Sequence, residues 1–203
     1  MANRCGRWAS PLHASSDVQA TSVNLVPVES PAHRDAARAL VSEYLHWVGG
    51  IARSNYGLSF DIDAMVRSDI EDSSKFYPPS GRFYLVQHAA SFVGVGGLKR
   101  LAPTVAEVQR MYVQPHLRGV GAGRLLVERL LQDARVLGYD TVRLESLRAL
   151  GAAHSLYRSV GFVEVEPYAA NSMNAYQSPE TLAKYRDSAV FMEVSLHAQN
   201  RDA

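Results

Sequence analysis

The stretch Arg118-Gly119-Val120-Gly121-Ala122-Gly123 joins a strand-like segment to a strongly periodic helical segment. Its three glycines lack the Cβ atoms that keep a ligand away from the backbone, and they tolerate the positive φ angles of a tight loop. A helix that begins here would direct its unpaired N–H groups and the positive end of its dipole at a bound anion. The stretch therefore predicts a binding site for a phosphorylated cofactor.

The residues on either side support this interpretation. Residues 105–113, which read Val-Ala-Glu-Val-Gln-Arg-Met-Tyr-Val, are rich in types that favour strands, and Pro115 ends the segment. On the other side, apolar residues recur at helical spacing until Gly138 provides a stop; they are Leu125, Leu126, Val127, Leu130, Leu131, Ala134 and Leu137. Strand, loop and helix follow in the order that an anion-binding turn requires. A tight turn without a ligand is the alternative.

Two familiar phosphate motifs do not fit. A Walker loop ends in Gly-Lys-Ser/Thr, whereas Gly123 is followed by Arg124 and Leu125. The dinucleotide fingerprint requires Gly-x-Gly-x-x-Gly, which the spacing of these glycines does not give. A nucleotide-binding domain is therefore disfavoured.

The pattern Arg118-x-x-Gly121-x-Gly123 resembles the Arg/Gln-x-x-Gly-x-Gly/Ala signature of the GNAT superfamily of N-acetyltransferases. Residues 107–113 resemble the strand that precedes the loop in those enzymes. Residues 153–162, Ala-His-Ser-Leu-Tyr-Arg-Ser-Val-Gly-Phe, resemble their later Ala-x-x-Leu-Tyr-x-x-x-Gly-Phe helix. The order and separation of the three segments also agree. One departure is Leu150, which stands where relatives often have an asparagine that contacts the cofactor.

The remaining segments predict a mixed α/β sheet with helices on both faces. Strands are expected at 23–28, 82–88, 91–98, 141–147, 162–165 and 189–196, and helices at 31–48, 61–70 and through Tyr157. Gly49-Gly50 should end the first helix, and residues 168–188 read as a long polar segment. The resemblance implies the GNAT fold, a single-domain and mostly antiparallel sheet with splayed central strands.

Length and charge limit the organisation of the chain and its partners. The 203 residues are enough for one domain, expected at 22–197 between a flexible tail (1–21) and a C-terminal tail (198–203). A transit peptide is the alternative for the first segment. The formal charge of +1 gives no large electrostatic field that would recruit nucleic acid or a membrane. Lys99, Arg100 and Arg110 are expected to be solvent-exposed residues of a surface rim.

Cysteine and apolar content point to a cytoplasmic protein. The single cysteine, Cys5, allows no internal disulfide, which is typical of a reducing compartment. No apolar run approaches the roughly 20 residues that span a bilayer. Histidines do not occur at a metal-ligand spacing, so no metal is expected.

The resemblance implies acetyl-CoA as the acyl donor and assigns its contacts to backbone groups. The amides of the loop would hold the pyrophosphate, and the end of the preceding strand would bind the pantetheine arm. These predicted cofactor-binding residues are Met111, Tyr112, Val113, Arg118, Gly119, Val120, Gly121, Ala122, Gly123 and Arg124. Alternatively, Arg118 shapes the loop. Met111 and Val113 can bind the cofactor through the backbone and also be core residues, because the N–H and the side chain point in different directions.

Acetyl transfer to an amine needs a base for the amine and an acid for the leaving thiolate. By resemblance, Tyr157 is the general acid and Glu107 the base. The alternatives are a core tyrosine with one hydrogen bond and a solvated glutamate. Glu145 is a weaker candidate for the base, or a contact for a cationic acceptor. Because the only cysteine lies in the expected tail, direct attack is favoured over an acyl-enzyme.

The sequence thus predicts an acetyl-CoA-dependent N-acetyltransferase acting on a primary amine of a small molecule or peptide. The alternative is a non-catalytic module that binds or senses acyl-CoA. Acceptor recognition is expected from residues 49–80 and 165–188, with Tyr168 and Asn171 as candidates for the mouth of the site. A homodimer is left open.

Overall fold

The computed structural model describes residues 22–72, 74–168 and 179–197. Seven strands form one sheet in the order β1-β2-β3-β4-β5-β7-β6. Their bounds are β1 Val23–Pro27, β2 Arg82–His88, β3 Ser91–Ala102, β4 Val105–Val113, β5 Thr141–Leu147, β6 Val163–Val165 and β7 Ala189–Ser195. Only β4 and β5 pair in parallel, and every other neighbouring pair is antiparallel. The expected mixed, mostly antiparallel sheet is confirmed.

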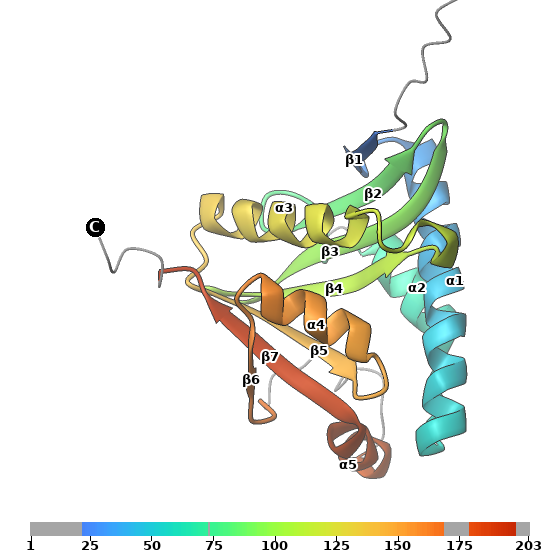
Figure 1. Cartoon of the computed structure of the whole chain (residues 1–203), viewed down its shortest axis with the longest axis vertical. Helices are drawn as coiled ribbons and strands as arrows, with labels where there is room; N and C mark the ends of the chain where they lie inside the picture. Colours follow the sequence, from blue (N-terminus) through green and yellow to red (C-terminus); the bar gives the residue numbers. More distant parts are fainter. Residues whose placement is uncertain (1–21, 73, 169–178, 198–203) are drawn as a thin grey trace, which may run out of the picture.

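Helices cover both faces of the sheet (Figure 1). On one side lie α1 (Pro31–Tyr56), α2 (Ile62–Glu71) and α5 (Pro179–Ser188). On the other lie α3 (Ala122–Val136) and α4 (Gly151–Ser159), and a short 3-10 turn, Pro115–Leu117, precedes the glycine loop. Each side buries its own apolar cluster, because a sheet between two helical layers must be apolar on both faces.

The two central strands diverge. β4 and β5 pair over only three positions, Val105 with Thr141, Ala106 with Val142 and Glu107 with Arg143. β4 continues to Val113 and β5 to Leu147, and the two strands separate along this length (Figure 1). The predicted splay is therefore present, and beyond Glu107 the edge of β4 that faces β5 has no strand partner there.

A bulge in β4 changes which side chains share a face. Tyr112 pairs with Val95 and Gln109 pairs with Gly97, so that Arg110 and Met111 together oppose the single residue between them on β3. Arg110 has a φ of +57°, which is uncommon for a residue with a Cβ.

The bulge breaks the simple alternation of side chains along β4. Met111 packs with the α3-side cluster, whereas Tyr112 belongs to the α1-side cluster. Arg110 turns to the α1 side as well, where it pairs with Asp69 of α2. Polar groups of β4 are thereby collected on one side of the diverging strands.

The first helix does not end at Gly49-Gly50, and that prediction was wrong. α1 continues to Tyr56 and is capped by Gly57, which has a φ of +64° and donates its N–H to the carbonyl of Arg53 at 3.0 Å. Gly49 is buried, and a Cβ built on it would lie 3.3 Å from Cδ1 of Ile62 in α2. Close packing of the two helices therefore outweighs the low helix propensity of glycine.

The segment 168–188 is not entirely loop. Its second part forms α5, in which Tyr185 is buried and meets the ring of Phe60 edge-on at 6.3 Å. The other predicted elements are confirmed, with ends that shift by a few residues; β3, for example, extends to Ala102. Both expected tails and Asn171 lie outside the described residues. None of the described helices is long and apolar enough to cross a membrane.

A buried ion cluster joins α2 to the β4 bulge. The Asp69 carboxylate is fully buried and pairs with both Lys75 and Arg110; Nη2 of Arg110 is 3.3 Å from Oδ1. Removing one member of such a cluster leaves the others charged and buried, which costs much more than losing an exposed pair.

We expect Asp69→Ala to lower the free energy of unfolding by about 3–5 kcal/mol, measured by urea denaturation. Glu71→Ala, on the same helix, is the matched control, because Glu71 forms an exposed pair with Arg38 at 3.5 Å. That control should cost no more than about 1 kcal/mol. Equal losses in the two variants would contradict the structural role given to Asp69.

Candidate functional site

The glycine loop forms the start of α3. Gly119 and Gly121 have φ values of +85° and +88°, and Gly121 is the N-cap. The first helical bond runs from the N–H of Leu125 to the carbonyl of Gly121 at 3.0 Å, so the N–H groups of Ala122, Gly123 and Arg124 have no partner within the helix. No side chain caps this helix. The loop thus presents consecutive amides and the positive end of a helix dipole, as an anion site requires.

The space outside this loop is open. A Cβ built on Gly119 or Gly121 meets no atom within 4 Å. Gly123 is different, because its Cβ would lie 3.2 Å from Cδ2 of Leu156 in α4. The first two glycines therefore serve backbone conformation and access, and the third serves the packing of α3 against α4.

The arginines that flank the loop are engaged with protein groups. Arg118 donates from Nε to the Val113 carbonyl at 3.1 Å, and its guanidinium lies 4.8 Å from the ring centroid of Trp47 in α1. Arg124 donates to Glu128 at 3.1 Å and to the Ser159 hydroxyl at 2.7 Å. These contacts agree with the loop-shaping alternative for Arg118.

The end of β4 directs backbone groups into the gap between the diverging strands. The N–H of Gln114 donates to Val93 of β3 at 2.9 Å, so the alternate residue, Val113, turns its N–H and carbonyl toward the opposite edge. The bond from Arg118 to the Val113 carbonyl agrees with this orientation. Backbone pairing with an extended ligand is thus geometrically available at Val113.

Tyr112 links this strand end to α1. Its hydroxyl donates to Glu43 at 2.9 Å, and the other carboxylate oxygen of Glu43 accepts from Gln114 at 2.9 Å. Burial, together with the hydrogen bond to Glu43, raises the pKa of Tyr112 to about 12. The Tyr112 side chain therefore has a structural role, and a cofactor would contact Tyr112 through its backbone.

Tyr157 lies in α4 and packs in the α3-side cluster. Its side chain is buried against Phe162, with ring centroids 5.9 Å apart. Burial raises the pKa of Tyr157 well above its usual value, with a smaller contribution from Tyr44 of α1. The phenol is therefore protonated at neutral pH.

Glu107 belongs to β4. It is fully buried at the last β4–β5 pair and accepts a hydrogen bond from Gln109 at 2.6 Å. A solvated glutamate, the alternative considered from sequence, does not match this burial. Glu107 thus lies where the strands diverge, whereas Tyr157 packs in the α3-side cluster.

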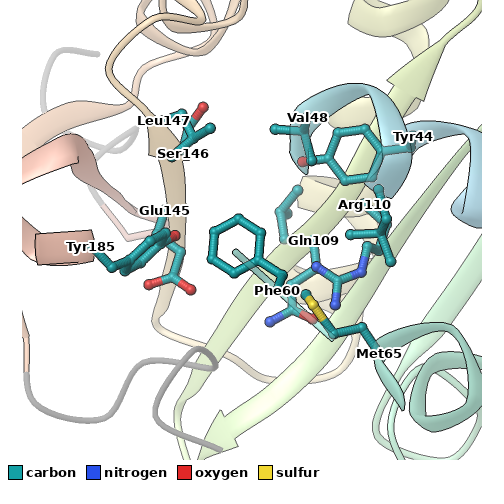
Figure 2. A pocket seen from close by; sticks show the side chains of 12 residues that line it. Tyr44, Val48, Phe60, Met65, Gln109, Arg110, Glu145, Ser146, Leu147 and Tyr185 are labelled. Atoms are coloured by element: carbon teal, nitrogen blue, oxygen red, sulfur yellow. The ribbon is translucent and has the colours of Figure 1, made fainter. Parts of the chain in front are cut away.

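A cavity of about 70 Å³ opens on the Glu107 side, between α1, α2, α5 and the diverging strands (Figure 2). Its lining includes Tyr44, Phe60, Gln109, Arg110, Glu145 and Tyr185. Burial, followed by the charge of Glu145, raises the pKa of Tyr185 well above its usual value. The cavity combines aromatic walls with a few buried polar groups, as small-molecule sites commonly do.

Sequence reasoning missed most of this lining. Arg110 was expected in a solvated rim, but its side chain is only 10% exposed and faces the cavity, so that expectation was wrong. The cause is the bulge, for which the sequence carries no clear signal. Tyr168 lies beneath the Arg143 guanidinium at 4.6 Å and against Phe191 at 5.2 Å, and it is not among the residues that line the cavity.

Comparisons with known proteins agree with this geometry. The model of the acetyltransferase (GNAT) family matches residues 50–162. An uncharacterized N-acetyltransferase of Dictyostelium discoideum is 43% identical over 67 residues, 33% of this chain and 31% of that protein, so the match spans less than a third of its length. An uncharacterized N-acetyltransferase of Schizosaccharomyces pombe is 29% identical over 153 residues, 74% of this chain and 89% of that protein.

The fold is shared with solved structures of the same family. PaiA N-acetyltransferase from Thermoplasma acidophilum, solved in complex with coenzyme A, superposes with a TM-score of 0.60 at 17% identity, covering 86% of this chain and 99% of that one. The family match extends over the glycine loop, the diverging strands and the helix that carries Tyr157. The chain belongs to the GNAT family of acetyltransferases.

Proposed function

We propose that this enzyme transfers the acetyl group of acetyl-CoA to a primary amine of a small molecule or peptide by direct attack in a ternary complex. The proposal is supported by the divergence of β4 from β5 beyond Glu107, by the uncapped start of α3 at the glycine loop, and by the positions of Glu107 in β4 and of Tyr157 in the α3-side cluster. The catalytic domain is proposed as residues 22–197, in a cytoplasmic protein.

The loop and the end of β4 would hold the donor. The pyrophosphate would accept hydrogen bonds from the amides at the start of α3, from Gly119 to Arg124, where the helix leaves N–H groups unused. The pantetheine arm would pair with backbone groups of residues 111–113, of which Val113 faces the gap. This arrangement would bring the thioester to the point where the strands separate.

The acceptor would enter from the α1 side. Glu107, directly or through water, would accept a proton from the amine as its nitrogen attacks the thioester carbon. The new C–N bond forms a tetrahedral intermediate, and the C–S bond then breaks. Tyr157 would donate its proton to the departing thiolate, for which its raised pKa keeps it protonated.

A thiol-release assay tests the activity itself. Full-length protein, acetyl-CoA and a panel of amines that includes amino acids, polyamines and short peptides should release free coenzyme A above the rate of hydrolysis. If no amine in the panel causes release of coenzyme A, but calorimetry shows that acetyl-CoA binds, the non-catalytic acyl-CoA-binding module is favoured instead.

Gly121→Glu should lower the affinity for acetyl-CoA by about 100-fold or more, because it places a carboxylate beside the bound phosphates. Gly138→Glu is the matched control: Gly138 also has a positive φ, +79°, and open space around it, but it lies at the far end of α3. Both variants should lose about 1–2 kcal/mol of stability through backbone strain. Unchanged calorimetric affinity in Gly121→Glu would refute the loop as the pyrophosphate site.

Tyr157→Phe should lower kcat by about 100-fold with little change in acetyl-CoA affinity. Because burial raises the pKa of Tyr157 well above its usual value, the phenol stays protonated as pH rises from 7 to 10. The ratio of wild-type to variant kcat should therefore stay constant over that range. A ratio near one under chemistry-limited conditions removes Tyr157 from the mechanism.

A further inference from the structure

One face of α1 lies against the segment that joins β4 to α3 (Figure 1). Glu43 and Trp47 are four residues apart in α1, so they project from the same face of the helix. Glu43 accepts hydrogen bonds from the Tyr112 hydroxyl and from Nε2 of Gln114, both at 2.9 Å. One turn farther along α1, the Trp47 ring stacks on Arg118, whose guanidinium carbon lies 4.8 Å from the ring centroid. α1 therefore contacts both the beginning and the middle of this segment.

The position of Trp47 suits this contact better than a role in the core. Its side chain is 37% exposed, and it is not a member of either apolar cluster of the described residues. The ring centroids of Tyr112 and Tyr44 lie 6.0 Å and 6.4 Å from that of Trp47, which holds the indole in place. Tryptophan is the best aromatic partner for a cation above its ring face. Arg118 thus accounts for a large aromatic side chain at a partly exposed position.

Arg118 connects Trp47 to the end of β4. Its Nε donates to the Val113 carbonyl at 3.1 Å, which ties Arg118 back across the 3-10 turn to the strand. Val113 is the residue whose backbone turns toward the gap between β4 and β5. The guanidinium is therefore held between a ring of α1 and a carbonyl of β4, immediately before the first glycine of the loop.

The loop beyond Arg118 has few constraints of its own. Gly119 and Gly121 have positive φ values, and α3 starts without a side-chain cap among the described residues. Val120, between the two glycines, is 56% exposed. Glycine loses more conformational entropy than any other residue when its backbone is fixed. A fixed Arg118 at one end and α3 at the other limit the conformations of the residues between them, which lowers the entropy that binding must remove.

We propose that Trp47 is a positioning residue for acetyl-CoA: it holds Arg118 against the Val113 carbonyl, so that the glycine loop is ordered before the pyrophosphate arrives. This inference rests on the proposed donor site. It adds a residue of α1, outside the loop and the strand, to the determinants of acetyl-CoA affinity. Trp47 acts through Arg118 rather than on the reacting atoms.

Substitutions of Trp47 in the full-length protein test the contact through the calorimetric Kd for acetyl-CoA. Trp47→Ala should raise this Kd by about fivefold, as expected for the loss of one partly exposed cation–π contact. Trp47→Phe keeps an aromatic face and should restore part of the affinity, whereas Trp47→Leu keeps only apolar bulk and should bind as weakly as Trp47→Ala. Wild-type affinity in Trp47→Leu overturns the inference.

His46→Ala is the matched control. His46 is the exposed neighbour of Trp47 in α1, and its Nδ1 lies 2.8 Å from the Ser42 carbonyl within the same helix. This variant should bind acetyl-CoA like the wild type. An equal loss of affinity in His46→Ala and Trp47→Ala would assign the effect to α1 as a whole and would overturn the role of Trp47.

A double-mutant cycle shows whether Trp47 acts through Arg118. In an Arg118→Ala protein the indole has lost its partner, so the further change Trp47→Ala should alter the Kd by less than about twofold. A second fivefold loss in that protein would mean that Trp47 affects the cofactor independently of Arg118. That result also overturns the inference.

The same titrations separate positioning from a purely structural role. A tryptophan that only stabilised α1 would lower the unfolding midpoint and the fraction of protein that binds, but the Kd of the folded fraction would stay unchanged. That outcome overturns the inference. If Trp47→Ala does not fold, the comparison of Trp47→Phe with Trp47→Leu decides the matter.

Gly121→Glu distinguishes a failure of this inference from a failure of the donor site. If Gly121→Glu loses affinity for acetyl-CoA while the folded Trp47→Ala protein keeps it, only the role of Trp47 is refuted. If acetyl-CoA does not bind to the wild type, or binds equally well to Gly121→Glu, the proposed donor site and this inference fail together.

Discussion

The buried carboxylate of Asp69 is the constraint on which the geometry of the site depends. It binds Arg110 at a bulge of β4. The backbone of Arg110 has a positive φ, which costs free energy in a non-glycine residue and persists when surrounding contacts offset that cost. The bulge in turn places Arg110 on the same side of the sheet as Glu107, Gln109 and Tyr112. One ion cluster between α2 and β4 therefore organises the polar wall of the cavity.

The separation of β4 from β5 lies between the two apolar clusters of the molecule. Pairing stops at Glu107, and beyond it this edge of β4 has no strand partner among the described residues. The glycine loop and Tyr157 lie toward α3 and α4, whereas Glu107 and the cavity lie toward α1 and α2.

The two sides are connected through aromatic residues of α1. Trp47 stacks with Arg118 of the loop and lies 6.0 Å from Tyr112, and Tyr44 lies 5.7 Å from Tyr112 while lining the cavity. Burial raises the pKa of Tyr44 and of Tyr157, which keeps both phenols neutral. Buried surroundings of this kind strengthen the electrostatic interactions between nearby charged groups.

The sequence by itself determined where the glycine loop, most strands and most helices lie, and that Tyr157 belongs to a helix. These features depend on local periodicity, glycine conformation and short motifs. Tertiary structure decided the rest. α1 passes through Gly49-Gly50 because α2 packs closely against it, and Arg110 is buried because a bulge and Asp69, 41 residues earlier in the chain, turn it inward. Such contacts join distant segments, and no local pattern in the sequence records them.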